Sequence, residues 1–94
     1  MSLEPIIESS GNVFSDLGFS PEDAVIMAMR AGLMAALRKT IAERGWTQEQ
    51  ASEHLAIGLS RASDLIRGKR DKFSLDMLVT LATRAGKHVE LTVA

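Results

Sequence analysis

The chain has 94 residues, of which 46% are hydrophobic and 24% charged, and its formal net charge at neutral pH is −1. These values fit one small globular domain and exclude a disordered chain. The absence of cysteine excludes a disulfide scaffold and a thiolate metal site, and no secretory signal opens the chain. We therefore expect a cytoplasmic protein without a membrane span.

Residues 1–19 are expected to form an N-terminal arm and a docking loop ahead of a domain that spans residues 20–94. Leu3, Ile6 and Ile7 fit a short strand or a flexible arm, and Pro5 argues against a helix. The apolar residues of the loop over 11–19 are expected to dock on the core: Val13, Phe14, Leu17 and Phe19. The first 29 residues carry five acidic side chains and no Lys or Arg.

A long helix is predicted over residues 21–44, with Ser20 as N-cap, Pro21 in the first turn and Gly45 after the end. Between residues 24 and 37, apolar side chains surround most of the helix and Arg30 is the one charged residue. A helix that is apolar all round must be covered on more than one side. Either this half of the helix is a protein interface, which we favour, or the N-terminal loop folds over it. The inward residues of the second half are expected to be Ile41 and Ala42.

Two short helices with a tight break between them are predicted over residues 47–68. Thr47 and Gln50 form the capping box of the first helix. Gly58 can cap the second helix, which runs from Leu59 to Arg67 with Gly68 after its end. Trp46, before the first cap, is interpreted as a core residue rather than a stacking platform. Two helices joined by so short a turn have the geometry that sets the second helix in a DNA major groove.

The second of these helices begins a basic segment: residues 61–72 carry five basic and two acidic side chains. Local charge, not the total, sets the electrostatic field at a docking face. Residues at the start of a recognition helix reach the bases, and the following residues are therefore predicted for base readout: Leu59, Ser60, Arg61 and Asp64. Phosphate contacts are predicted for Gln48, Ser63, Arg67, Lys69 and Arg70.

A last helix begins after its cap Ser74 and ends at Gly86, with an expected inward row of Leu75, Leu78, Val79 and Ala82. The tail then alternates apolar Val89, Leu91 and Val93 with polar residues, which predicts a half-buried strand. A single strand needs a partner for its backbone groups. That partner is either the N-terminal arm or the same strand of a second subunit, and we favour the homodimer.

Signs of catalysis and of cofactor binding are absent from the sequence. His54 and His88 stand alone, no nucleophile elbow or glycine-rich phosphate loop is present, and the acidic residues are scattered. We expect a protein that is not an enzyme and needs no cofactor or metal.

Residues 47–78 resemble the helix-turn-helix of the Cro/repressor-like (XRE) family, in the branch of HigA-type antitoxins. The matching segments are residues 47–49, Ile57, Leu65, residues 67–69 and residues 73–75, with residues 11–18 matching upstream. The chain departs from the family pattern where Ser52, Ala56, Gly58 and Ala62 replace its usual Ala, Gly, Ser and Val or Ile.

The resemblance implies an all-α fold, a lambda-repressor-like helix-turn-helix bundle with a short C-terminal β-strand. It also implies a regulator that binds double-stranded DNA on the nucleoid, represses its own operon and neutralises a small RelE-like toxin. Two alternatives remain open. One is a protein-interaction module whose helix-turn-helix does not read DNA; the other is a stand-alone repressor without a toxin.

Overall fold

The structure is a computed structural model that describes residues 6–8 and 18–93. The predictions for Leu3, Val13, Phe14 and Leu17 lie outside these residues. The described elements are β1 (Ile6–Glu8), α2 (Pro21–Arg44), α3 (Gln48–Leu55), α4 (Leu59–Ile66), the 3₁₀ turn η1 (Arg70–Lys72), α5 (Leu75–Arg84) and β2 (Glu90–Thr92). Helices dominate, so the predicted all-α helix-turn-helix bundle is confirmed. Among the described residues, no helix is both long and apolar enough to cross a bilayer.

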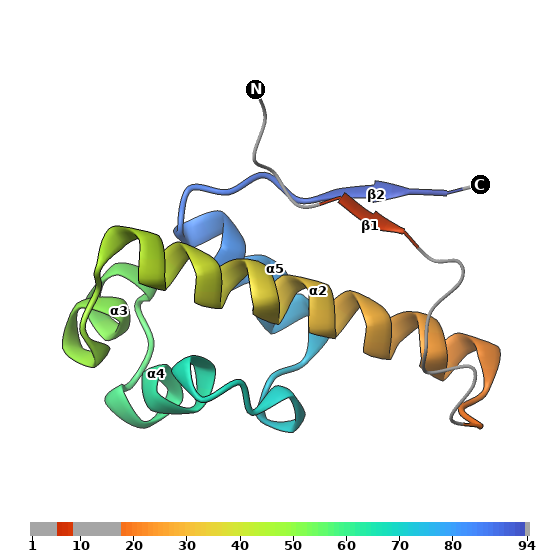
Figure 1. The fold of residues 1–94 in the computed structure, drawn as a ribbon, viewed down its shortest axis with the longest axis horizontal. Helices are drawn as coiled ribbons and strands as arrows, with labels where there is room; N and C mark the ends of the chain where they lie inside the picture. The colour runs from red at the N-terminus through yellow and green to blue at the C-terminus, as the bar shows by residue number, and fades with distance from the viewer. Residues whose placement is uncertain (1–5, 9–17, 94) are drawn as a thin grey trace.

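The long helix α2 is the support on which the other elements rest. Its predicted bounds are confirmed: the Ser20 hydroxyl accepts from the backbone N–H of Asp23 at 3.2 Å, and Gly45 follows the last turn with φ +64°. Figure 1 shows α2 crossing the whole molecule, with α3 and α4 on one side and the two strands on the other. Helix α5 packs along α2. Helix α4 therefore packs directly on α2, whereas α3 packs against α4 and α5.

In the described part of the chain, the core is one cluster to which α2, α3, α4 and α5 all contribute. Its largest fully buried side chains are Leu33, Leu37, Leu55, Leu65, Phe73, Leu78 and Leu81. Two side chains predicted to face inward, Ala42 and Val79, are exposed. On α5 the buried row is Leu78, Leu81, Ala82 and Ala85, which follows the i, i+3, i+4, i+7 spacing of one helix face and leaves Val79 outside it. Phe19, predicted to dock on the core, is 42% exposed.

The four described α-helices end in the same hydrogen-bond pattern. A residue with positive φ follows each helix, and the next backbone N–H donates to a carbonyl five residues back, as Trp46 does to Ile41 at 3.1 Å. Glycine occupies this position after α2, α4 and α5, but Ala56, with φ +55°, occupies it after α3. An L-residue other than glycine is strained there by about 1–2 kcal/mol. The departure at Ala56 is therefore a strained position at the turn between α3 and α4.

Relief of this strain should stabilise the protein. We expect Ala56→Gly to raise the free energy of unfolding by about 0.5–1 kcal/mol, because the relieved strain exceeds the added backbone entropy of glycine in the unfolded chain. The matched control is Gly45→Ala, at φ +64° with no atom within 4 Å of the added Cβ, which should cost a similar amount. Urea denaturation of both variants measures the two effects. A loss of stability in Ala56→Gly would contradict the expectation.

The C-terminal strand pairs with the N-terminal arm in a two-stranded parallel sheet. The register places Ile6 opposite Glu90, Ile7 opposite Leu91 and Glu8 opposite Thr92. Of the two partners predicted for this strand, the arm is therefore the one seen within the chain. Leu91 and Val93 nevertheless remain 59% and 78% exposed, so the strand is less buried than its alternation predicts. The second edge of β2 has no strand beside it in the described part of the chain.

Candidate nucleic-acid interface

Helices α3 and α4 form the predicted helix-turn-helix. The capping box closes as expected: the Thr47 hydroxyl accepts from the backbone N–H of Gln50 at 3.1 Å, and the Gln50 side chain accepts from that of Thr47 at 2.9 Å. Gly58 caps α4 in an extended conformation, and α4 ends at Ile66, one residue earlier than predicted. The Ser52 hydroxyl donates to the Ile57 carbonyl and so braces the turn between the helices.

The outward face of α4 follows from its buried face. Ala62 and Leu65 are both 0% exposed. The residues on the opposite side of the helix, spaced i, i+3, i+4 and i+7, are Ser60, Ser63, Asp64 and Arg67. We call these four the outward ridge. Leu59, at the start of the helix and 49% exposed, extends it. The fold thus brings together three of the four residues predicted to read bases and two predicted to contact phosphates.

Arg61, the fourth residue predicted for base readout, lies on the flank of α4 rather than on the outward ridge. Arg61 is exposed, but its guanidinium contacts other parts of the chain. Nη1 donates to the carbonyl of Lys72, and Cζ lies 5.7 Å from the centroid of the Phe73 ring. A guanidinium has five N–H donors, so this bond leaves others for a ligand. In the described conformation Arg61 points toward η1.

Asp64 is paired with a cation that was predicted to hold a phosphate. The Lys69 ammonium lies 3.8 Å from the Asp64 carboxylate, and their side chains are 45% and 22% exposed. An ion pair this exposed contributes little to stability, at most about 1 kcal/mol. Its larger effect is electrostatic, because the carboxylate offsets one positive charge beside the outward ridge.

Gln48 joins the beginnings of the two helices. Its side-chain amide donates to the backbone carbonyl of Leu59 at 3.3 Å. The backbone N–H groups at the start of α3 therefore lie next to the first turn of α4. Unpaired N–H groups at a helix N-terminus favour an anion, and this position suits the predicted phosphate contact.

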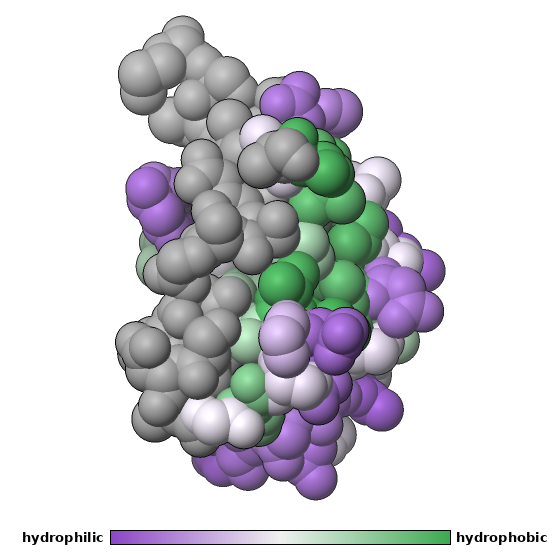
Figure 2. Space-filling view, turned by 90° about the vertical axis from the view of Figure 1, so that its right-hand side faces the viewer, coloured by the Kyte–Doolittle hydropathy of each residue, from purple (hydrophilic) through white to green (hydrophobic). Residues whose placement is uncertain are grey.

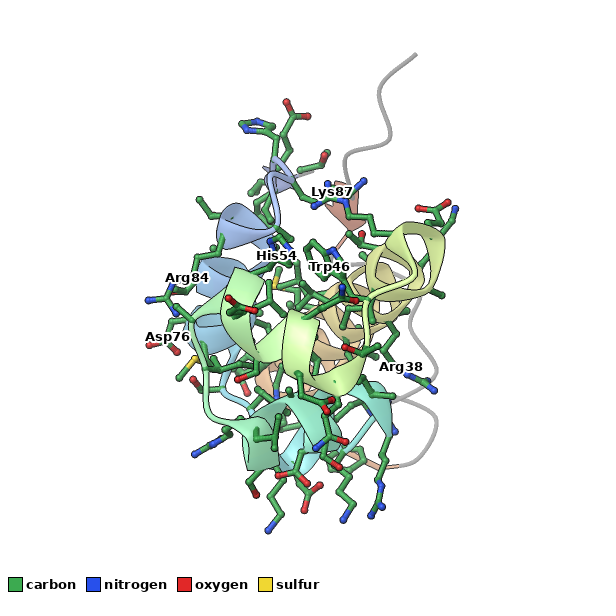
Figure 3. All side chains as sticks on the ribbon, turned by 90° about the vertical axis from the view of Figure 1, so that its left-hand side faces the viewer. Arg38, Trp46, His54, Asp76, Arg84 and Lys87 are labelled. Carbon is green, nitrogen blue, oxygen red and sulfur yellow. The ribbon has the colours of Figure 1, made fainter. Side chains whose placement is uncertain are left out.

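Four arginines hold backbone carbonyls around the helix-turn-helix, a role that the sequence did not predict. Arg84 of α5 donates to the carbonyl of Leu55 at 3.0 Å, at the end of α3, and Arg38 of α2 donates to that of Ile66 at 3.1 Å, at the end of α4 (Figure 3). Arg30 and Arg61 hold carbonyls of the segment over residues 70–73. A cation at a helix C-terminus satisfies unpaired carbonyls and opposes the helix dipole. Part of the positive charge predicted for DNA therefore supports the fold.

Trp46 lies against the core, as the sequence interpretation expects, and also contacts a second ring of the chain. Its side chain is half-buried and packs against the core cluster, as predicted. Its ring also stacks on that of His54, with centroids 4.3 Å apart and planes 6° from parallel, as Figure 3 shows. The two rings connect the residue before α3 with the last turn of that helix. His54 is thus an exposed residue with a structural contact.

Comparison with known proteins identifies the family of the chain. No curated protein and no solved structure matches it. The family described as a helix-turn-helix domain matches residues 13–94, a range that contains α2 to α5 and β2. This match is consistent with the XRE-like resemblance of residues 47–78 and with a DNA-binding regulator. The chain therefore belongs to the helix-turn-helix domain family.

Proposed function

We propose that this protein is a sequence-specific regulator of transcription that binds double-stranded DNA with α4 in the major groove. The observation that supports this proposal is the outward ridge of α4. The start of α3 lies beside this ridge, and residues 67–72, the last part of the basic segment, follow it. A helix whose polar ridge faces outward between flanking cations can dock against base edges while the cations contact phosphates. Its action needs no cofactor and takes place in the cytoplasm, on the nucleoid.

Each residue has a distinct part in this proposal. Leu59 contacts a thymine methyl, Ser60 and Asp64 face base edges, and Arg61 reads guanine after leaving the Lys72 carbonyl. The phosphates are contacted by Gln48, Ser63, Arg67, Lys69 and Arg70.

The DNA-bound form in this proposal is a homodimer. One edge of β2 has no strand beside it among the described residues. Leu91 in β2 and Val93 just after it are exposed, and Val89 just before it packs on the core. Pairing of this edge with the same edge of a second subunit supplies backbone partners and a two-fold axis. Two recognition helices related by such an axis read half-sites about one DNA turn apart.

The regulator is further proposed to be an antitoxin that represses its own operon and neutralises a RelE-like toxin. The resemblance to HigA-type antitoxins is the ground for this role. Apolar surface is also available for a partner: Figure 2 shows a strip of apolar residues on the face turned to the viewer, and Ile26 on the first half of α2 is 44% exposed. Co-purification with a small basic protein encoded beside this chain tests the role, and a stand-alone repressor gives no such complex.

A second candidate function is a protein-interaction module that does not read DNA. It is favoured by the internal contacts of Arg61 and Lys69, which engage two cations of the proposed interface within the chain.

Selection from a random duplex library, followed by fluorescence anisotropy at two salt concentrations, separates the two candidates. A DNA reader enriches one sequence and binds it about 10³-fold or more tightly than a scrambled duplex, with affinity that falls steeply as salt rises. An interaction module enriches no sequence.

Asp64 offers a test of the charge arrangement. We expect Asp64→Asn to increase affinity for duplex DNA about threefold to tenfold, because it removes a negative charge from the outward ridge and releases Lys69 for a phosphate. The slope of log K against log[salt] should steepen by about 0.9, the value for one more neutralised phosphate. Anisotropy titrations over a salt series measure both changes. A weaker complex would contradict this expectation and would show that the Asp64 carboxylate makes a favourable base contact, such as accepting from cytosine N4.

A further inference from the structure

Arg30 is the one charged side chain between residues 24 and 37 of α2, and its guanidinium is engaged at all three nitrogens. Nε donates to the carbonyl of Phe73 at 3.0 Å, Nη2 donates to the carbonyl of Arg70, and Nη1 lies 3.6 Å from the sulfur of Met27. The residue is half-buried. A solvated surface arginine would have no such fixed set of partners, so this side chain has a definite structural role.

The two carbonyls that Arg30 holds lie at the first residue of η1 and at the residue after its end. They are 40 and 43 positions away from Arg30 along the chain. Three cations of the basic segment belong to this turn or directly precede it: Lys69, Arg70 and Lys72. Among the described residues, the backbone–backbone hydrogen bonds of this turn are short-range, such as Arg70 N–H to the Gly68 carbonyl at 3.0 Å and Phe73 N–H to the Arg70 carbonyl at 3.2 Å. One 3₁₀ turn of this kind is weak when isolated.

We propose that Arg30 is a positioning residue for DNA binding: it fixes the turn over residues 69–73 to α2, and thereby sets the place of its cations relative to α4. The proposal rests on the proposed function. Arg30 directs its own donors into the protein, so it acts through the turn rather than on a phosphate. Ordering the turn before binding lowers the entropy lost when its cations meet the DNA backbone.

The geometry explains why arginine is required here. The planar guanidinium presents several donors in a fixed fork, and here two of them reach two carbonyls at once. Lysine has one ammonium group and cannot hold both carbonyls in the same geometry. Two surface grooves adjoin Arg30, one lined by Met27 and residues 68–71 and the other by Ile26 and residues 71–75, so water can reach the freed carbonyls when the arginine is shortened. The Arg30→Met variant should therefore fold.

The test compares Arg30→Met and Arg30→Lys with the wild type, and Arg44→Met is the matched control. Arg44 is an exposed arginine of the same helix, with its guanidinium 5.1 Å from the Trp46 ring and away from the turn. NMR order parameters for the amides of residues 70–72 should fall from about 0.85 to below about 0.6 in Arg30→Met, with those of α5 unchanged. Affinity for the selected duplex should fall about tenfold in both Arg30 variants and stay unchanged in Arg44→Met. The slope of log K against log[salt] should not change.

Three results would overturn the proposal. The first is an unchanged order parameter in the turn, and the second is an equal loss of affinity in Arg44→Met. The third is a salt slope that becomes shallower by about 0.9, which would make Arg30 a phosphate contact itself. If the wild type binds no duplex, the proposed function fails, and the order parameters alone then decide whether Arg30 holds the turn.

Discussion

Phe73→Ala is expected to lower the free energy of unfolding by about 3–5 kcal/mol, the usual cost of removing a buried aromatic side chain. Phe73 is 2% exposed and belongs to the core cluster. Its ring also lies beneath the Arg61 guanidinium, and its carbonyl accepts from Arg30. The substitution therefore leaves a cavity and loosens the basic turn together. Because small domains are stable by only about 5–15 kcal/mol, this variant should approach unfolding at room temperature.

Urea denaturation followed by circular dichroism measures this loss. Phe73→Leu is the graded control, since it keeps most of the apolar volume, and it should cost about 1–2 kcal/mol. Met77→Ala, at a side chain 37% exposed on α5, should cost less than either. A cost below about 1.5 kcal/mol for Phe73→Ala would show that this ring does not anchor the turn to the core.

Arg67→Glu is expected to weaken binding to duplex DNA by at least about tenfold at 0.1 M salt, because it replaces the cation that we propose contacts a phosphate by a repelled anion. Arg67 is exposed at the C-cap of α4, on the outward ridge. The salt slope should become shallower by about 0.9, and the loss should be similar for the selected and scrambled sequences, because a phosphate contact carries no base information. Anisotropy titrations with both duplexes at several salt concentrations give the two quantities.

Lys87→Glu is the matched control for this prediction because it makes the same change in net charge. Figure 3 places Lys87 at the end of the molecule opposite α4. The affinity of the Lys87→Glu variant for duplex DNA should stay within about twofold of the wild type. Charges separated by more than about 10 Å in solvent are largely screened at this salt concentration. Equal effects of the two variants would mean that net charge, not the outward ridge, governs binding, and would favour the interaction module.

The fold shows how a chain with net charge −1 divides its positive charges between two tasks. Arg30, Arg38 and Arg84 hold backbone carbonyls, and Arg61 does so in the described conformation. Arg67 lies on the outward ridge instead. Within residues 61–72, Arg61 bonds to a carbonyl and Lys69 pairs with Asp64, so a count of basic residues overstates the number of cations free to contact a ligand.

The helix ends are what the sequence by itself determined. Ser20, Thr47 and Ser74 cap helices through bonds to a backbone N–H three residues on, and glycines follow α2, α4 and α5 with positive φ. These signals are local: each depends on residues within one turn of the helix, so they can be read without the rest of the chain.

Tertiary structure alone decided the partners of the arginines, the exposure of Val79 and the pairing of β2 with the arm. Arg30 and Arg38 bond to carbonyls 28 to 43 positions away, and no local pattern specifies a contact over such a separation. Val79 and Leu81 lie on opposite margins of the apolar face of α5. The direction from which α2 packs determines that Leu81 is buried and Val79 is exposed. Periodicity along one helix defines a face but not its neighbour, because the neighbour comes from elsewhere in the chain.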